Sequence, residues 1–307
     1  MKPILVTGYT NPDLDGFAGV IAYTEFLNTK KNKAVSKISG QPHTEVKYIM
    51  ARFDLSYPAK IKNIISYDKI VLVDSSSLNG LDKKLNPKNV IEIIDHRKVN
   101  DAPLFLNAKR QIELVGSAAT LIAEKFRKEN ITPAKRSAIL LYAAIISNTL
   151  NFQAKVTTKR DRAAARWLNA KLNLSDSLAK DMFKAKSDLC GGKLEKRITN
   201  DFAWFNLNNK KVGIAQIEMV GAKELVKQRK KEILQKLNTL KKDLKLDFIF
   251  LSIIDLGAGF NLFITPDKNT QDLISPILNL KFKNNEAVRP ELIMRKEIVP
   301  WLKKKLK

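Results

Sequence analysis

Cysteine and histidine are scarce in this chain, which holds one cysteine and two histidines among 307 residues. With Cys190 alone, no internal disulfide can form, and the two glycines that follow it offer no second thiol to a metal ion. No apolar run approaches the ~20 residues of a membrane span, and Met1-Lys2 leads into a strand pattern without the cleavage region of a signal peptide. We therefore expect a cytoplasmic protein that works in a reducing compartment without a membrane.

Acidic residues are also few, since 31 Asp and Glu stand against 55 Lys and Arg, a net charge of +24. Such an excess attracts polyanions, among them nucleic acid, polyphosphate and phosphate-rich metabolites. The alternative is that lysine-rich runs such as 227–231 and 303–305 are solvated helix faces. Nucleic-acid processing is supported by the charge only, because Trp167, Trp204 and Trp301 are not interleaved with the basic runs as base-stacking residues would be.

The first half of the chain alternates between strand patterns and helix patterns. Apolar strands are expected at 3–8, 69–74 and 90–95, and helices at 16–30, 57–66, 116–129, 133–147 and 159–171. This alternation predicts an α/β fold with a mostly parallel sheet and helices on both faces.

The pattern breaks at 185–197, which we interpret as a linker containing Cys190. Beyond it we expect strands at 212–217, 248–254 and 260–264 and helices at 223–243 and 270–278. The chain therefore divides into a first α/β domain at 1–186 and a second, smaller α/β domain at 196–307.

Acidic residues stand at the ends of several predicted strands. Asp13 and Asp15 follow the first strand, Asp74 ends the next, and Asp95 ends the third, with His96 beside it. Because the carboxyl ends of parallel strands form the ligand crevice of an open α/β sheet, we expect these side chains to converge. Carboxylates with imidazole suit Mn²⁺ or Mg²⁺ better than a thiolate-bound metal. The alternative is that each acidic residue is a turn former or a helix cap.

Five short motifs follow one another in order along the first domain. They are Asn11-Pro12-Asp13-Leu14-Asp15, Val73-Asp74-Ser75, Ile94-Asp95-His96-Arg97, Val115-Gly116-Ser117-Ala118-Ala119-Thr120 and Ile145-Ile146-Ser147-Asn148-Thr149-Leu150. Together they resemble the DHH phosphoesterase superfamily, in particular the manganese-dependent (family II) inorganic pyrophosphatases and related exopolyphosphatases. The segments 210–217 and 294–300 resemble the associated C-terminal domain, whose basic residues clamp the substrate phosphates. The resemblance thus implies a DHH-type metal-binding domain at 1–186 and a substrate-clamping α/β lid domain at 196–307.

The resemblance implies a metal-dependent phosphohydrolase that cleaves a phosphoanhydride, either inorganic pyrophosphate or short polyphosphate, with a metal-activated water in the inter-domain cleft. It implies one or two ions of Mn²⁺ or Mg²⁺, with Asp74 as the bridging ligand. Asp13 would hold the first ion, and the second would be held by Asp15, His96 and Asn148. The DHH-type relatives also offer an edge strand that could pair two copies into a homodimer.

The resemblance further assigns residues to the substrate. Asp74 and Arg97 would be catalytic, and Arg97, Arg295 and Lys296 would bind the phosphates of a small substrate. The alternative for Arg295 and Lys296 is a structural one, in which both lie at the end of a helix where cations favour the macrodipole. His43 is expected at the surface, in a loop next to no other motif.

Four positions depart from the family pattern. Tyr9 and Asn148 stand where the family has a histidine and an aspartate among its metal ligands, and Arg97 replaces the second histidine of Asp-His-His. Ala203 stands where the C-terminal domain has a substrate-contacting lysine. These departures leave a second hypothesis open, a catalytically impaired pseudoenzyme that binds phosphorylated ligands or a protein partner.

Overall fold

The computed structural model describes residues 2–58, 64, 66–98, 100–175, 177–187 and 193–306, and it forms two compact units, Met1–Met182 and Phe183–Lys307. Cys190 and most of the helix expected at 57–66 lie outside the described residues. Each unit has its own sheet and its own hydrophobic core.

The first unit is built on a sheet of five parallel strands in the order β2-β1-β3-β4-β5. The strands are β1 (Ile4–Thr7), β2 (Ala34–Ser36), β3 (Ile70–Val73), β4 (Val90–Asp95) and β5 (Lys109–Ile112). All four residues of β3 are buried, which is why the sequence shows a continuous aliphatic run there. The expected α/β fold with a mostly parallel sheet is confirmed.

The order of these strands reverses beside β1. The chain runs from β1 outward to β2 and then returns to the other side of β1 to form β3. In open α/β sheets ligands bind at such a reversal, outside the carboxyl ends of the strands. The residues that follow β1 and β3 therefore flank the position where a ligand is expected.

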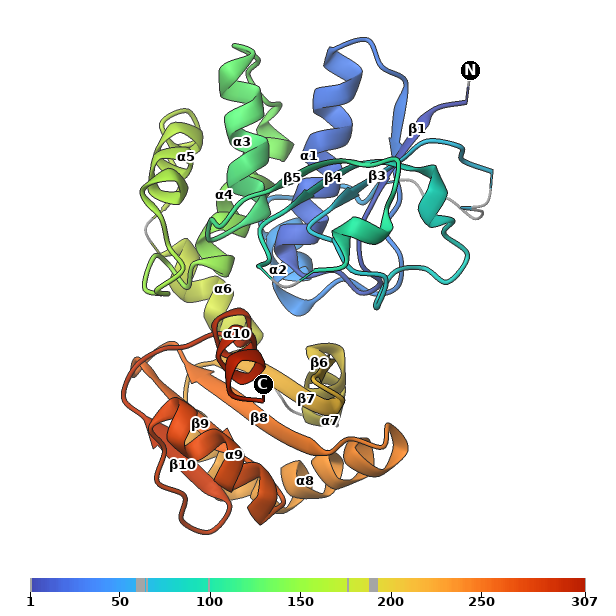
Figure 1. Cartoon of the computed structure of the whole chain (residues 1–307). Helices are drawn as coiled ribbons and strands as arrows, with labels where there is room; N and C mark the ends of the chain where they lie inside the picture. Colours follow the sequence, from blue (N-terminus) through green and yellow to red (C-terminus); the bar gives the residue numbers. More distant parts are fainter. Residues whose placement is uncertain are drawn as a thin grey trace. The chain divides into compact units, whose positions relative to one another are not determined.

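Helices cover the first sheet, and the most deeply buried is α1 (Leu14–Thr29), whose side chains are apolar nearly all round. It contacts β1, β2 and β3 as well as three other helices, α2, α3 and α4 (Figure 1). Phe26 of α1 packs edge-on against Phe126 of α3, with the ring centres 5.2 Å apart. The other elements of this unit are α2 (Thr44–Arg52), η1 (Pro87–Asn89), η2 (Ala102–Leu104), α3 (Ala118–Lys128), α4 (Lys135–Asn148) and α5 (Lys159–Asn169). The division between the units falls inside α6 (Leu178–Lys186).

The second unit has a mixed sheet in the order β10-β9-β8-β7-β6, and among its described strands only β7 and β8 pair in parallel. Asn208 and Asn209 join β6 to β7 with positive φ angles of 49° and 62°, as a two-residue hairpin turn requires. Its strands are β6 (Phe202–Leu207), β7 (Lys210–Met219), β8 (Phe248–Asp255), β9 (Phe260–Ile264) and β10 (Glu286–Arg289). Its helices are α7 (Lys193–Asn200), α8 (Ala222–Asp243), α9 (Lys268–Leu278) and α10 (Arg295–Lys305).

The linker expected at 185–197 is wrong for its second part, because α7 begins at Lys193. Leu194 and Ile198 lie one helical turn apart and are both fully buried in the core of the second unit. Burial of this apolar pair outweighs the polar composition around it and makes the segment helical. No helix in the part of the chain that the structure describes combines the length and the apolar character needed to cross a membrane.

Candidate metal centre

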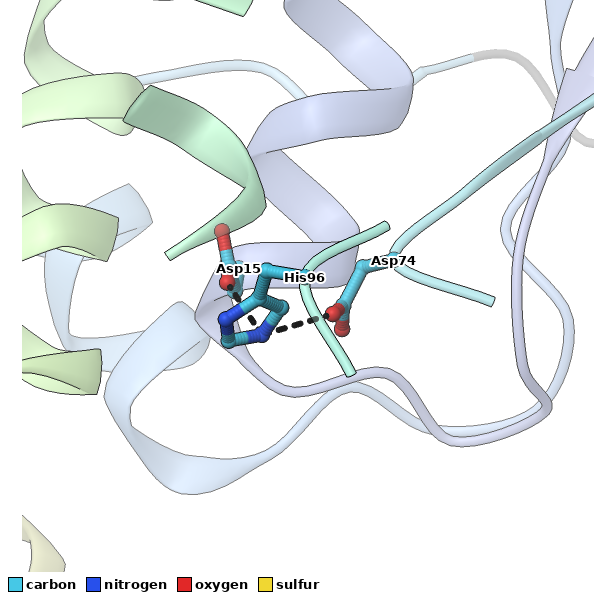
Figure 2. A group of neighbouring side chains, drawn as sticks. All are labelled: Asp15, Asp74 and His96. Atoms are coloured by element: carbon cyan, nitrogen blue, oxygen red, sulfur yellow. Dashed lines mark ion pairs between the residues drawn. The ribbon is translucent and has the colours of Figure 1, made fainter. Parts of the chain in front are cut away.

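Asp15, Asp74 and His96 come together at the carboxyl edge of the parallel sheet, and each offers one ligand atom within 4.8 Å of the other two (Figure 2). Nε2 of His96 lies 3.5 Å from Oδ2 of Asp15 and 3.4 Å from Oδ1 of Asp74. All three residues are buried. The convergence expected from the strand ends thus occurs for three of the five residues named as metal ligands.

Asp15 is held by the N-terminus of α3. Its carboxylate accepts the backbone N–H groups of Ala118 and Ala119, each at 2.8 Å, and the hydroxyl of Ser117 at 2.7 Å. The free N–H groups and the dipole at a helix start favour a negative charge. Burial nevertheless raises the pKa of Asp15 above its ordinary value, and repulsion by Asp74 raises it further. A cation beside Asp15 would relieve both effects.

Asp161 fixes the start of α3 in turn, and sequence reasoning missed it. This fully buried carboxylate accepts the N–H of Gly116 at 2.9 Å and the hydroxyl of Thr120 at 2.6 Å. It also closes a capping box with Thr158 at the start of α5. The spacing Thr158-x-x-Asp161 was a readable signal for that cap, but it did not reveal the contact with α3.

Asp74 directly follows β3 and has a positive φ of 53°, a backbone conformation that aspartate tolerates better than most residues. Its Oδ1 is buried and lies 2.9 Å from Nη1 of Arg97 in an ion pair, although it accepts no hydrogen bond from any residue that the structure describes. Burial raises the pKa of Asp74 above its ordinary value, Arg97 opposes that shift, and Asp13 adds to it.

The ring of His96 is oriented by a backbone carbonyl. Nδ1 lies 2.9 Å from the oxygen of Val115, and because a carbonyl can only accept, Nδ1 must carry the proton. In the neutral ring Nε2 then presents its lone pair on the side of Asp15 and Asp74. This is the arrangement of a metal-binding histidine whose other nitrogen is fixed by a protein acceptor.

Asp95 supports its neighbours at the end of β4. It accepts the hydroxyl of Ser76, the N–H of His96 at 2.6 Å and a guanidinium N–H of Arg97 at 3.0 Å. Burial alone would raise the pKa of Asp95, but the charge of Arg97, with help from His96, brings it below its ordinary value. Asp95 therefore remains an anion that positions Arg97.

Asp13 and Asn148 lie near the group but are used differently. Asp13 is the N-cap of α1, where its Oδ1 accepts the N–H of Gly16 at 2.9 Å. Asn148, the last residue of α4, donates its side-chain N–H to Asp15 Oδ2. Asp13 is outside the group of three, and the expectation that both residues bind metal stays a prediction.

Arg97 and Tyr9, two of the departures from the family pattern, contact each other. Arg97 Cζ lies 5.1 Å from the centre of the Tyr9 ring, and the Tyr9 hydroxyl oxygen accepts the backbone N–H groups of Ser76 and Ser77. Burial raises the pKa of Tyr9, which keeps the phenol neutral. Burial alone would lower the pKa of Arg97, but Asp74 and Asp95 raise it above its ordinary value.

His43 also differs from its expected place. Its backbone N–H donates to the oxygen of Pro12 at 3.0 Å, and its ring is half-buried. The expectation of a surface histidine next to no other motif was therefore wrong. Its backbone braces the loop that carries Asp13.

Arg295 and Lys296 belong to the second unit, and the structural alternative for them is wrong. They begin α10 rather than end a helix, and a cation at a helix start is disfavoured by the macrodipole. Arg295 is held by Asp201, through an ion pair of 2.7 Å and a hydrogen bond to the main-chain oxygen of the same length. Its backbone N–H donates to Gln216 at 2.7 Å.

The three gathered side chains fit one divalent cation. Two carboxylates and a neutral imidazole form a donor set that suits Mn²⁺ or Mg²⁺. The buried Oδ1 of Asp74 faces Nε2 of His96 at 3.4 Å as well as Arg97 at 2.9 Å, so a cation bound beside His96 could share this oxygen with Arg97.

Comparison with known proteins identifies both parts of the chain. Residues 3–145 match the model of the DHH family, N-terminal domain, and residues 180–305 match the DHHA2 domain. The chain is 30% identical over 301 residues to the "Probable manganese-dependent inorganic pyrophosphatase" of Clostridium acetobutylicum, covering 97% of this chain and 96% of that protein. It is 28% identical over 305 residues to the protein of the same name from Bacillus mycoides, covering 98% of each.

Solved structures agree with these matches. A crystal structure from Methanococcus jannaschii assigned to the family II inorganic pyrophosphatases has a TM-score of 0.83 and 28% identity, covering 99% of each chain. An exopolyphosphatase-related protein from Bacteroides fragilis has a TM-score of 0.50 and 13% identity, covering 99% of this chain and 91% of that one. At this low identity the second likeness concerns the fold alone.

Proposed function

This chain belongs to the DHH family, as a pyrophosphatase-like hydrolase with a C-terminal DHHA2 domain, and we propose from that premise that it hydrolyses inorganic pyrophosphate with Mn²⁺. The family and fold expected from the motifs are confirmed by the comparisons. Short polyphosphate as a further substrate, and Mg²⁺ as an alternative ion, are parts of the same proposal.

The group of Asp15, Asp74 and His96 carries the proposal. When bound there, Mn²⁺ or Mg²⁺ would lower the pKa of a coordinated water and neutralise charge on the phosphate oxygens. Asp15 and Asp74 would hold the ion with carboxylate oxygens and His96 with Nε2. The helix start that holds Asp15 and the carbonyl that holds His96 fix these side chains before any ligand arrives.

Three cations are proposed to bind the substrate phosphates. The side chain of Arg97 is 30% exposed, which leaves one edge of the guanidinium available to a phosphate. Arg295 and Lys296 stand at the start of α10, where the helix dipole favours an anion. A phosphate there would offset the unfavourable position of both cations on the helix dipole.

We place the substrate in a cleft between the two units, because the proposed metal ligands belong to one unit and Arg295 and Lys296 to the other. Closure of the second unit over the first would bring both sets of charges onto one substrate and exclude water. The proposal of a substrate-clamping domain depends on this closure.

A catalytically impaired pseudoenzyme is the second candidate, and one observation favours it. Asn148 presents an N–H group to Asp15 where the family has a carboxylate, so one anionic ligand is missing. Ala203, in place of a substrate-contacting lysine, removes a positive charge from the second unit. This candidate predicts that pyrophosphate binds tightly without phosphate release.

We also propose that the protein forms a homodimer through β5, an edge strand of the parallel sheet. Leu106 and Leu114, on either side of this strand, are 77% and 63% exposed. An edge strand with exposed apolar neighbours is suited to pairing with a second copy. Light scattering should give twice the chain mass, and Leu106→Lys together with Leu114→Lys should give the monomer mass.

Phosphate release from pyrophosphate and tripolyphosphate tests the hydrolase proposal directly. The purified protein would be assayed with Mn²⁺, with Mg²⁺ and with chelator, beside Asp74→Asn. Metal-dependent release that is lost in the variant would support the assignment. Release that persists in the chelator or in the variant would contradict it, and tight pyrophosphate binding without release would favour the pseudoenzyme.

A further inference from the structure

We propose that the guanidinium of Arg97 is the second cation of this centre, so that one metal ion per chain, held by Asp15, Asp74 and His96, completes it. The inference rests on the proposed function, because it assigns the number of ions to the same site. It replaces the expectation of one or two ions with a single value. Arg97 takes the part that a second ion would otherwise have beside Asp74.

Both oxygens of the Asp74 carboxylate face the fork of Arg97. Nη1 lies 2.9 Å from Oδ1, and Nη2 donates to Oδ2 at 3.2 Å. Oδ1 is also the oxygen that lies 3.4 Å from Nε2 of His96, so it faces the group of three as well. An ion bound beside His96 can therefore share Oδ1 with Nη1 of Arg97, whereas Oδ2 faces only Nη2. If Asp74 bridged two ions through both of its oxygens, Oδ2 would have to turn away from Arg97.

Further contacts keep the guanidinium in this position. Nη1 donates to the main-chain oxygen of Asp74 and to Oδ1 of Asp95, which is 3.0 Å away. On another side the ring of Tyr9 lies against Arg97, at the cation–π distance of 5.1 Å. The Tyr9 hydroxyl already accepts two backbone N–H groups, from Ser76 at 3.3 Å and Ser77 at 3.1 Å. Tyr9 thus presents an aromatic face to a cation, where a histidine would present a nitrogen lone pair to a metal.

The charges of the site agree with one ion. Four carboxylates contribute to it, namely Asp13, Asp15, Asp74 and Asp95. One divalent ion and the guanidinium bring three positive charges against these four negative ones. A second divalent ion would bring the total to five and would be repelled by Arg97, which cannot lose its proton. Asp13 then contributes charge, while its Oδ1 caps α1 through the N–H of Gly16.

The number of bound ions tests the proposal. Chelator-stripped protein would be titrated with MnCl₂ in a calorimeter, and the Mn²⁺ paramagnetic resonance spectrum would be recorded at saturation. Wild type should bind one Mn²⁺ per chain with the spectrum of an isolated ion. Arg97→Gln keeps a polar side chain but removes the charge, and it should bind a second ion with a spin-coupled spectrum. Arg97→Lys, which keeps the charge, should stay at one ion.

Asp13 locates the second ion in the variant. Asp13→Asn should remove that additional ion from the Arg97→Gln background. In otherwise wild-type protein it should leave nearly unchanged the affinity of the ion held by Asp15, Asp74 and His96. Removal of a direct ligand should weaken the second ion by more than the ~10–100-fold typical of an indirect contact. A circular dichroism melt of each variant shows that the protein measured is folded.

Specific results would overturn the inference. Two ions in wild type, or none, would contradict it whether or not any variant folds, and one ion in folded Arg97→Gln would remove the role of Arg97. Phosphate release measured on the same samples separates the two proposals. One bound ion without pyrophosphate hydrolysis would defeat the proposed function alone, and hydrolysis with two bound ions would defeat the inference alone.

Discussion

Each unit of this protein holds a buried aspartate at the start of a helix, and only one of the two aspartates belongs to a site. Asp15 accepts the N–H groups of Ala118 and Ala119 at the start of α3. In the second unit Asp255 accepts those of Gly221 and Ala222 at the start of α8, at 3.2 and 2.8 Å. Burial and a helix N-terminus are therefore not enough to make a metal centre.

The direction of the neighbouring strands makes the difference. In the first sheet β1, β3 and β4 all run parallel, so the residues after them meet at one edge, and Asp15 has Asp74 and His96 beside it. In the second sheet the register partners of Asp255 are Met219 on β7 and Phe260 on the antiparallel β9. With apolar neighbours, Asp255 accepts only backbone N–H groups among the described contacts, from the turn after β8 and from the start of α8.

The largest expected effect comes from removing the shared carboxylate of the first sheet. Asp74→Asn keeps the shape of the side chain and tolerates the positive φ, but it removes the charge. We expect Mn²⁺ affinity to fall by more than ~100-fold and phosphate release to be lost with it. Calorimetry and a phosphate assay measure the two effects. Full activity in this variant would contradict the assignment of a metal centre to the first sheet.

The second unit is expected to act on substrate and not on metal. Arg295→Met removes a guanidinium that begins α10, and the KM for pyrophosphate should rise by ~10–100-fold, as for the loss of a charged hydrogen bond. The number of Mn²⁺ ions bound should not change. Arg289→Met is the matched control, since Arg289 pairs with Glu291 and a backbone oxygen in the same unit and should leave the KM as it is.

The pH dependence of metal binding tests the pair of buried carboxylates in the first unit, Asp15 and Asp74. In the metal-free protein the Asp15 and Asp74 pair has its pKa values raised to about 7 and about 8, so protons must leave when an ion binds. Because two protons leave, Mn²⁺ affinity should rise by up to about a hundredfold per pH unit near pH 6, rise less steeply toward pH 8, and level off above that. A pH-independent affinity would contradict the shared titration.

The same shifts predict how the stability of the metal-free protein changes. The folded state holds protons that the unfolded state releases near pH 4, so the free energy of unfolding should decrease as pH rises from about 4 to 8. Added Mn²⁺ should oppose this loss, and the increase in melting temperature on adding Mn²⁺ should be larger at pH 8 than at pH 6. Thermal melts at both pH values, with and without the ion, measure it.

Asp161 tests whether the start of α3 positions Asp15. Asp161→Asn should weaken Mn²⁺ binding by about tenfold, as is typical for a residue that orients a ligand. Glu124→Gln is the control. Glu124 on α3 pairs with Arg160 on α5, and these hydrogen bonds do not involve Gly116 or Thr120. A loss of stability in Asp161→Asn with unchanged Mn²⁺ affinity would reduce Asp161 to a structural role.

The smallest effect on metal is expected for the aspartate of the second sheet. Asp255→Asn should leave Mn²⁺ affinity unchanged and lower the free energy of unfolding by about 2 kcal/mol, because hydrogen bonds to a charged acceptor are weakened. Denaturant titration measures the second effect. Weakened Mn²⁺ binding would show that the two regions are less independent than their strand directions indicate.

The sequence predicts the parallel half better than the mixed half. In the first sheet β3 and β4 are aliphatic runs that end in an aspartate, and parallel strands bring such ends together. The contact of Ser117 with Asp15 and the role of Asp161 were not predicted, because they depend on pairing across the fold, 102 positions apart for Ser117 and Asp15. No local pattern carries that information.

In the second unit two helices differ from what the sequence predicted, since 193–197 was expected in a linker and Arg295 and Lys296 at the end of a helix. Both residues stand at the start of α10, which continues past Pro300 to Lys305. Likewise α7 is polar apart from a single apolar pair, whose burial becomes apparent only with the sheet it covers. Tertiary contacts, more than local preference, define both helices.

The contact between the guanidinium of Arg97 and Asp74 affects how the centre depends on the supply of metal ions. A positive charge that is part of the polypeptide is present in every molecule from synthesis onward and cannot be scavenged by a competitor. A centre that draws one cation from its surroundings responds to the first power of the free metal concentration, and one that draws two responds to the square. A cell short of manganese would thus lose this activity in simple proportion to the shortage.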